Sequence, residues 1–105
     1  MVLSDDEIAG RLESLKGWRL HGNEITKTFT LKDFTAAMAF VTAVSLLSER
    51  ANHHPDIDIR YNRVTLVLST HSAGGLTEKD FTLVAVLGMI DSFSGTMFAN
   101  EAEVL

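Results

Sequence analysis

The histidines are the side chains in this sequence best suited to proton transfer near neutral pH, because an unperturbed imidazole has a pKa of about 6.5. His53 and His54 are adjacent and precede Pro55, and His71 stands before the Gly-rich run Ser-Ala-Gly-Gly. Two neighbouring imidazoles can divide the roles of acid and base. Small residues after His71 would also let a planar ligand lie close to exposed backbone amides.

Each histidine also has a structural interpretation. His53 and His54 could satisfy backbone groups in a helix-to-strand connector, and His71 could donate to a carbonyl at the end of a strand. His21 lies in a polar stretch, and we expect it to be solvent-exposed and uninvolved. A three-histidine zinc site is a further alternative. We expect no metal site, because adjacent histidines before a proline point in diverging directions.

Two carboxylates lie near these histidines. Glu49 is one helical turn before His53, and Asp80 is in the first turn of a predicted helix. Each could be a solvated or helix-capping charge, or could orient a histidine or hold a polar edge of a ligand. Asp56 and Asp58 are expected to be exposed.

The hydrophobic pattern predicts the elements that position these groups, in the order helix, two strands, helix, two strands, helix. Ser4 and Glu7 form a capping-box pattern for a first helix ending near Gly17, and Asp33 caps a long second helix. That helix must stop before Pro55. Its predicted apolar stripe consists of Ala37, Phe40, Val41, Val44, Leu47 and Ala51.

The second half of the chain contains a hairpin and a third helix. Alternation over 57–68 predicts the hairpin, with Asn62 taking the positive φ of its turn and His71 at the end of its second strand. Thr77 and Asp80 resemble a capping pair for a helix over 81–90 that is apolar around nearly its whole circumference. One small sheet cannot cover such a helix, so we infer a subunit partner.

These elements predict an α+β fold, a four-stranded antiparallel sheet with three helices packed on one face, in the order αββαββα. At 105 residues the chain should form one domain, residues 1–105. Whether 91–105 extends the third helix or frays is left open.

Composition excludes several classes of function. The net charge of -5 and the scattered basic residues argue against direct nucleic-acid binding. The absence of cysteine excludes disulfides, thiolate metal sites and thiol nucleophiles. An acidic N-terminus and the lack of a long apolar run predict no membrane association and a cytoplasmic protein.

The run ERANHHPDIDIRYNRVTLVLSTHSAGGLTEKD, residues 49–80, resembles the signature of the pterin-4a-carbinolamine dehydratase family. That signature is an acidic or polar residue, three spacers, His-His-Pro, five spacers, an aromatic residue, nine spacers, a histidine and a later aspartate. The matching residues are Glu49, His53, His54, Pro55, Tyr61, His71 and Asp80. The resemblance covers about 4–91, and the tail 92–105 departs from the family pattern.

The resemblance implies the removal of water from 4a-hydroxytetrahydrobiopterin, which gives quinonoid dihydropterin for tetrahydrobiopterin recycling after an aromatic amino acid hydroxylase. It implies a pterin substrate and no metal or organic cofactor. Together with the apolar third helix, it also implies a homodimer or homotetramer. The implied catalytic residues are His53, His54 and His71, with acid and base not assigned among them. The implied substrate-binding residues are Glu49, Pro55, Thr70, Ser72, Ala73 and Asp80.

Two other functions stay open. A eukaryotic member of the family also serves as a dimerisation partner of a homeodomain transcription factor, so the chain could be a protein-interaction module. It could also be a pterin-binding domain without turnover.

Overall fold

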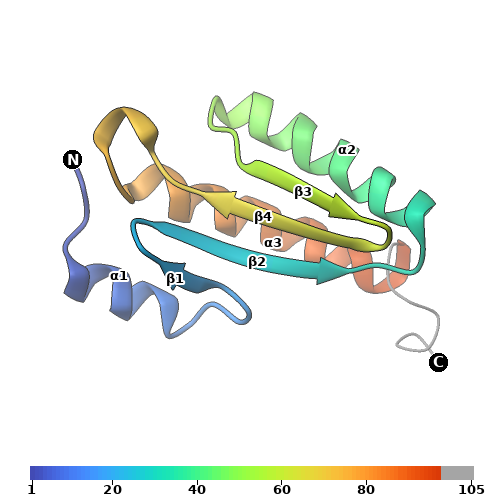
Figure 1. The fold of residues 1–105 in the computed structure, drawn as a ribbon, viewed down its shortest axis with the longest axis horizontal. Helices are drawn as coiled ribbons and strands as arrows, with labels where there is room; N and C mark the ends of the chain where they lie inside the picture. The colour runs from blue at the N-terminus through green and yellow to red at the C-terminus, as the bar shows by residue number, and fades with distance from the viewer. Residues whose placement is uncertain (98–105) are drawn as a thin grey trace.

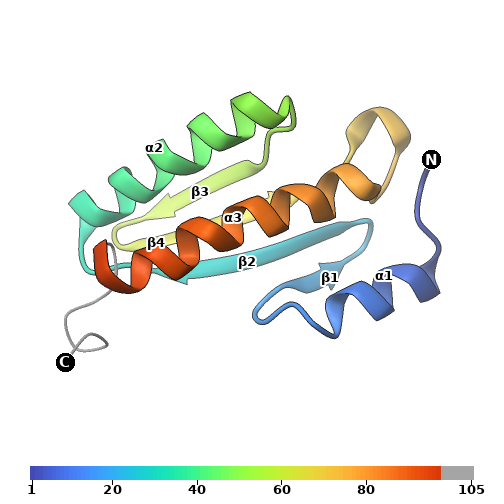
Figure 2. The same ribbon diagram turned by 180° about the vertical axis from the view of Figure 1, so that it is seen from behind.

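The computed structural model describes residues 1–97 and contains a four-stranded antiparallel sheet with strand order β1-β2-β4-β3. The three α-helices lie on one side of this sheet, and α3 runs along it (Figures 1 and 2). The predicted α+β class and element order are therefore confirmed. The elements are α1 (Asp5–Leu12), β1 (Arg19–His21), β2 (Glu24–Thr30), α2 (Phe34–Ala51), β3 (Asp56–Arg60), β4 (Arg63–Leu68), the 3₁₀ turn η1 (His71–Ala73) and α3 (Glu78–Met97).

The core lies between the sheet and the helices, because alternate side chains of the central strands point to opposite faces. Val64, Leu66 and Leu68 of β4 are fully buried. Phe29 of β2 contacts Phe40 of α2 with ring centroids 4.8 Å apart. This apolar layer fixes the ends of α2, β4 and α3 relative to one another.

The first helix begins as predicted and ends early. The Ser4 hydroxyl accepts from the Glu7 backbone N–H and the Glu7 carboxylate accepts from the Ser4 N–H, which completes the capping box. The helix ends at Leu12 rather than near Gly17. Ser14 bonds back to the Arg11 carbonyl instead, in line with the preference of serine for local backbone bonds at helix ends.

The second helix is capped as predicted, because an Asp33 carboxylate oxygen accepts from the Ala36 N–H at 2.8 Å. The helix ends at Ala51, before Pro55. Ala51, predicted on the apolar stripe, is exposed at the last helical position, whereas Ser48 is buried one turn earlier.

The turn of the second hairpin differs from the prediction in one residue. Tyr61, not Asn62, has the positive φ, at 54°. The Asn62 side chain donates to the Leu31 carbonyl at 3.0 Å, and the Asn62 carbonyl accepts from the Leu31 N–H. Asn62 therefore ties the turn to the segment before α2, and the left-handed conformation falls on its neighbour.

The third helix is longer than the predicted 81–90, and it extends into the tail as far as Met97. The part of the tail over 98–105 lies outside the described residues. One side of α3 is buried, but Ala85 and Met89, which lie one turn apart, are both exposed, Met89 to 71%. The structure thus leaves a narrow apolar strip of α3 uncovered. Within residues 1–97, no helix has both the length and the hydropathy to cross a bilayer.

Candidate active site

A hollow of about 410 Å³ opens where α2 ends, β3 begins, β4 ends and α3 begins. Its volume falls within the range of roughly 300–1,000 Å³ that is typical of small-molecule sites. The lining residues are Asn52, His53, His54, Pro55, Asp56, Ser69, Thr70, His71, Ser72 and Lys79. The structure thus brings the three predicted histidines, which are separated in sequence, around one cavity.

The end of α2 fixes the direction of the histidine pair. Asn52 ends the helix in the left-handed conformation, with φ 54°. The His53 backbone N–H donates to the Ser48 carbonyl at 3.1 Å, a bond typical of helix C-terminal motifs. Pro55 then restricts the backbone of His54 to extended conformations. His53 and His54 therefore leave the helix in set directions.

His53 is bonded to a buried carboxylate. Its Nε2 lies 2.6 Å from Oδ1 of Asp80, and the side chains are 12% and 0% exposed respectively. The other carboxylate oxygen of Asp80 accepts from the Thr70 hydroxyl at 2.8 Å and from the Thr77 N–H at 2.9 Å. Asp80 does not line the hollow and lies behind His53.

His54 is bonded to an exposed carboxylate. Its Nε2 lies 2.7 Å from Oε1 of Glu49, with side-chain exposures of 57% and 81%. Glu49 does not line the hollow. The two adjacent histidines thus have acidic partners in opposite environments, one dry and one solvated.

His71 lies in η1, not at a strand end as predicted, because β4 stops at Leu68 and the chain then turns. Thr70 and Gly75 form an isolated bridge that closes this loop. Among the described residues, no side chain or backbone group bonds to the His71 ring. The His71 imidazole is exposed at the wall of the hollow and is available to a ligand.

The β1–β2 turn holds the His71 loop from outside. The Asn23 side chain donates to the Gly74 carbonyl at 3.3 Å, and the Ser69 hydroxyl donates to the Asn23 carbonyl at 3.1 Å. The sequence gives no sign of this support, because no local pattern relates residues so far apart.

Four of the six predicted binding residues line two adjoining hollows, whereas Glu49 and Asp80 line neither. Pro55, Thr70 and Ser72 line the histidine hollow, and Ala73 lines a second hollow of about 360 Å³ that shares Thr70 and Ser72. Lys79 lines both and was not among the predicted site residues. The sequence signal that could have identified Lys79 as a site residue is its position next to Asp80, in the first turn of α3.

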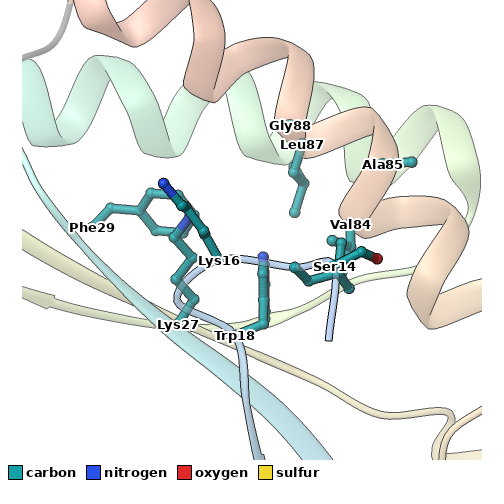
Figure 3. Close-up of a pocket in the computed structure, with 10 residues that line it drawn as sticks. Ser14, Lys16, Trp18, Lys27, Phe29, Val84, Ala85, Leu87 and Gly88 are labelled. Carbon is teal, nitrogen blue, oxygen red and sulfur yellow. The ribbon is translucent and has the colours of Figure 1, made fainter. Parts of the chain in front are cut away.

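A separate hollow of about 230 Å³ lies between the segment after α1, β2 and α3. Figure 3 shows Trp18, Phe29 and Leu87 around it, with the lysines 16 and 27 also on its wall. Of the described residues that line it, none is a histidine or a carboxylate. It therefore lacks the proton-transfer groups that the histidine hollow has. No group of three or more possible metal ligands occurs among the described residues.

The start of α3 is tied to α1 by an ion pair. The Arg11 guanidinium donates to the Glu78 carboxylate, and this bond lowers the pKa of Glu78. The Arg11 guanidinium also lies over the Phe81 ring, 5.4 Å from its centroid. The first turn of α3, which supplies Lys79 and Asp80, is thus fixed on its outer side.

The sequence profile of the pterin 4 alpha carbinolamine dehydratase family matches residues 1–89. The chain belongs to this family. The matched range contains the His-His-Pro run and the later histidine of the pterin-4a-carbinolamine dehydratase signature. These residues line the hollow.

Bacterial relatives of the pterin-4a-carbinolamine dehydratase family match over nearly their whole length. A protein of Chloroflexus aurantiacus, provisionally named a pterin-4-alpha-carbinolamine dehydratase, is 60% identical over 88 residues, which cover 84% of this chain and 95% of that protein. A protein of Roseiflexus castenholzii with the same provisional name is 58% identical over 89 residues, covering 85% and 96%.

Two solved structures of pterin-dehydratase-like proteins share the fold. A transcriptional coactivator/pterin dehydratase from Brucella melitensis superposes with a TM-score of 0.81 at 36% identity, covering 86% of this chain and 98% of that one. A pterin dehydratase-like protein identified as a RuBisCO assembly factor in the alpha-carboxysome gives 0.58 at 25% identity, covering 70% and 87%.

Proposed function

We propose that this protein is a dehydratase that removes water from 4a-hydroxytetrahydrobiopterin, as a step of tetrahydrobiopterin recycling in the cytoplasm. One observation carries the proposal: His53, His54 and His71 line a single hollow of small-molecule size. Membership of the family supports the choice of a pterin as the substrate.

The reaction needs two proton transfers on one ring system. The N5–H bond of the pterin breaks and a C4a–N5 double bond forms, while the C4a–O bond breaks and the departing hydroxyl takes a proton to leave as water. A base must therefore face N5 and an acid must face the 4a-hydroxyl. Positioned acid-base groups typically contribute about 10²- to 10⁴-fold each to rate.

The three imidazoles supply these groups in our proposal. His53 and His71 exchange protons with N5 and the 4a-hydroxyl, and His54 holds the ring together with Pro55. The loop from Thr70 to Ala73 binds the polar edge of the pterin. Asp80 and Glu49 act through His53 and His54 respectively, since neither carboxylate lines the hollow.

Stopped-flow dehydration of a synthetic 4a-hydroxytetrahydropterin tests the proposal. We expect His53→Ala, His54→Ala and His71→Ala each to reduce the rate of dehydration. For a residue that transfers a proton, the loss should be about 10²-fold or more. His21→Ala is the control, because His21 is exposed in the β1–β2 hairpin and does not line the hollow. A wild-type protein that does not accelerate the reaction would refute the function, and wild-type rates in all three variants would refute the assignment of the histidines.

We also propose that copies of the chain associate through the helical face as a homodimer or homotetramer. The uncovered apolar side chains on the helices support this arrangement, Phe34, Met38 and Leu46 on α2 and Met89 on α3. The same surface favours a second candidate function, binding to another protein. The coactivator description of the Brucella melitensis structure is in keeping with that alternative.

A further inference from the structure

We propose that Thr70 and Thr77 are positioning residues, whose hydroxyls hold the Asp80 carboxylate so that His53 keeps its proton on Nε2 and presents Nδ1 to the hollow. The kinetic consequence rests on the proposed function. The arrangement of protons does not, because it is a property of the free protein.

A chain of hydrogen bonds leads from α3 to His53. The Lys79 N–H donates to the Thr77 hydroxyl oxygen at 3.3 Å, and the hydroxyls of Thr77 and Thr70 lie 2.7 Å apart. Oδ2 of Asp80 accepts from the Thr70 hydroxyl. Since Thr70 has one hydroxyl hydrogen and gives it to Asp80, Thr77 must donate to Thr70. The direction of every bond in the chain is thereby fixed.

The same logic assigns the tautomer of His53. A carboxylate oxygen only accepts, so Nε2 of His53 carries the hydrogen in its bond to Asp80. In the neutral ring the lone pair is then on Nδ1. Nδ1 has no hydrogen-bond partner among the described residues. In this part of the chain the one buried side-chain nitrogen or oxygen without a partner is Ser48 Oγ, so Nδ1 is unpaired but not buried. Nδ1 is therefore open to the hollow that His53 lines.

This tautomer makes His53 the base of the pair of proton transfers. Nδ1 accepts the proton from N5 of the pterin, and the resulting imidazolium keeps its hydrogen bond to Asp80. The negative carboxylate stabilises the positive ring without itself moving a proton. His71, which has no carboxylate partner among the described residues, is then left to donate to the departing hydroxyl.

Burial explains why the threonines matter to this assignment. Thr70 and Thr77 are each 6% exposed and Asp80 is 0% exposed, so bulk water cannot replace a lost hydroxyl freely. Without the Thr70 hydroxyl, Oδ2 keeps only the Thr77 N–H, and the carboxylate can rotate away from His53. The Thr70 hydrogen is also already committed to Asp80, so this hydroxyl is poorly placed to donate to a ligand.

The test combines NMR with kinetics on the full-length protein. ¹⁵N-detected imidazole correlations report which ring nitrogen of His53 carries hydrogen, in wild type, Thr70→Val and Thr77→Val. Thr70→Ser restores the hydroxyl without the methyl group. Thr65→Val is the matched control, because it breaks the 2.8 Å hydroxyl pair of Thr28 and Thr65 on the outer face of the sheet.

We expect wild type to show hydrogen on Nε2 of His53, and Thr70→Val to show a mixture of tautomers. In the dehydration assay Thr70→Val should lower kcat by about 10-fold with little change in KM, because misplacing a catalytic group costs up to about 10²-fold. Thr70→Ser should recover most of the loss, and Thr65→Val should match wild type. Thr77→Val should show a smaller effect, since the bond from Thr70 to Asp80 remains.

Three results would overturn the inference. They are hydrogen on Nδ1 of His53 in wild type, an unchanged tautomer and kcat in Thr70→Val, or a rise in KM alone, which would make Thr70 a substrate-binding residue. If Thr70→Val does not fold, Thr77→Val and the wild-type spectrum still decide the matter. A protein inactive on pterins that shows the Nε2 tautomer and its loss in Thr70→Val would refute the function and retain the assignment.

Discussion

Oδ1 of Asp80 lies 2.6 Å from Nε2 of His53, although 27 positions separate the two residues in sequence. The bond joins the first turn of α3 to the segment just past the end of α2. The orientation of the imidazole therefore depends on how the two helices pack. A site preorganised in this way does not have to reorganise during the reaction.

Replacing Asp80 with asparagine removes the buried charge behind His53 and keeps the shape of the side chain. We expect kcat for pterin dehydration to fall by about 10²-fold, within the range for an acid-base group, because an amide does not stabilise the imidazolium. Stopped-flow rates and circular dichroism would separate this effect from unfolding. Asp58→Asn, on the exposed strand β3, is the control. A near-normal rate in Asp80→Asn would contradict a role for this carboxylate.

Glu49→Gln should have a much smaller effect. The ion pair of Glu49 and His54 is solvated, and exposed pairs contribute only about 0.2–1 kcal/mol, so we expect less than about a fivefold loss of rate. Measuring kcat/KM for this variant beside Asp80→Asn compares the exposed and buried carboxylates directly. A loss of rate as large as that of Asp80→Asn would contradict the prediction that the exposed ion pair contributes less to catalysis than the buried one.

The ion pair of Arg11 and Glu78 predicts a pH dependence of stability. The bond lowers the pKa of folded Glu78 below its ordinary value of 4.5, so its stabilisation is present above pH 4.5 and is lost as the pH falls through the folded pKa. Glu78→Gln should lower Tm by at most a few degrees at neutral pH, and less in acid. Thermal melts across this pH range check it, with Glu13→Gln as the control. If the Tm difference between wild type and Glu78→Gln grows in acid, the prediction is wrong.

A charge on the exposed strip of α3 should weaken self-association. Met89 is 71% exposed in the single chain, and burying a carboxylate there without a partner is unfavourable. We expect light scattering to give a dimer or tetramer for wild type and a smaller species for Met89→Glu. Leu20→Glu, on β1, should leave the mass unchanged. A monomeric wild type would instead leave this strip available to another protein.

The sequence predicted the elements well because their signals are local. The capping pattern of Ser4 and Glu7 and the Asp33 cap appear in the structure as expected. The end of the first helix was predicted too late, because Leu15 continues the helical apolar spacing of Ile8 and Leu12 beyond the last helical residue. The positive φ was assigned to Asn62 on residue preference, whereas the bonds of its side chain and carbonyl to Leu31 decide the turn.

The sequence predicts which residues form the candidate site more readily than it predicts the hydrogen bonds that hold them. The types and settings of His53, His54 and His71 made them candidates, and the family resemblance implied their roles. The structure places all three at one hollow. The pairing of His53 with Asp80 and of Asn23 with Gly74 depends on distant parts of the chain meeting. Such contacts leave no periodic trace in a single sequence.

The length of α3 places the last helical residue far from the histidine hollow. Lys79 borders the histidine hollow and Met97 is the last helical residue, so at 1.5 Å per residue they lie about 27 Å apart along the axis. A dye, an affinity tag or a fused carrier attached beyond Met97 would thus start far from the imidazoles. Immobilising the protein by that end should keep the reaction centre accessible to dissolved pterins.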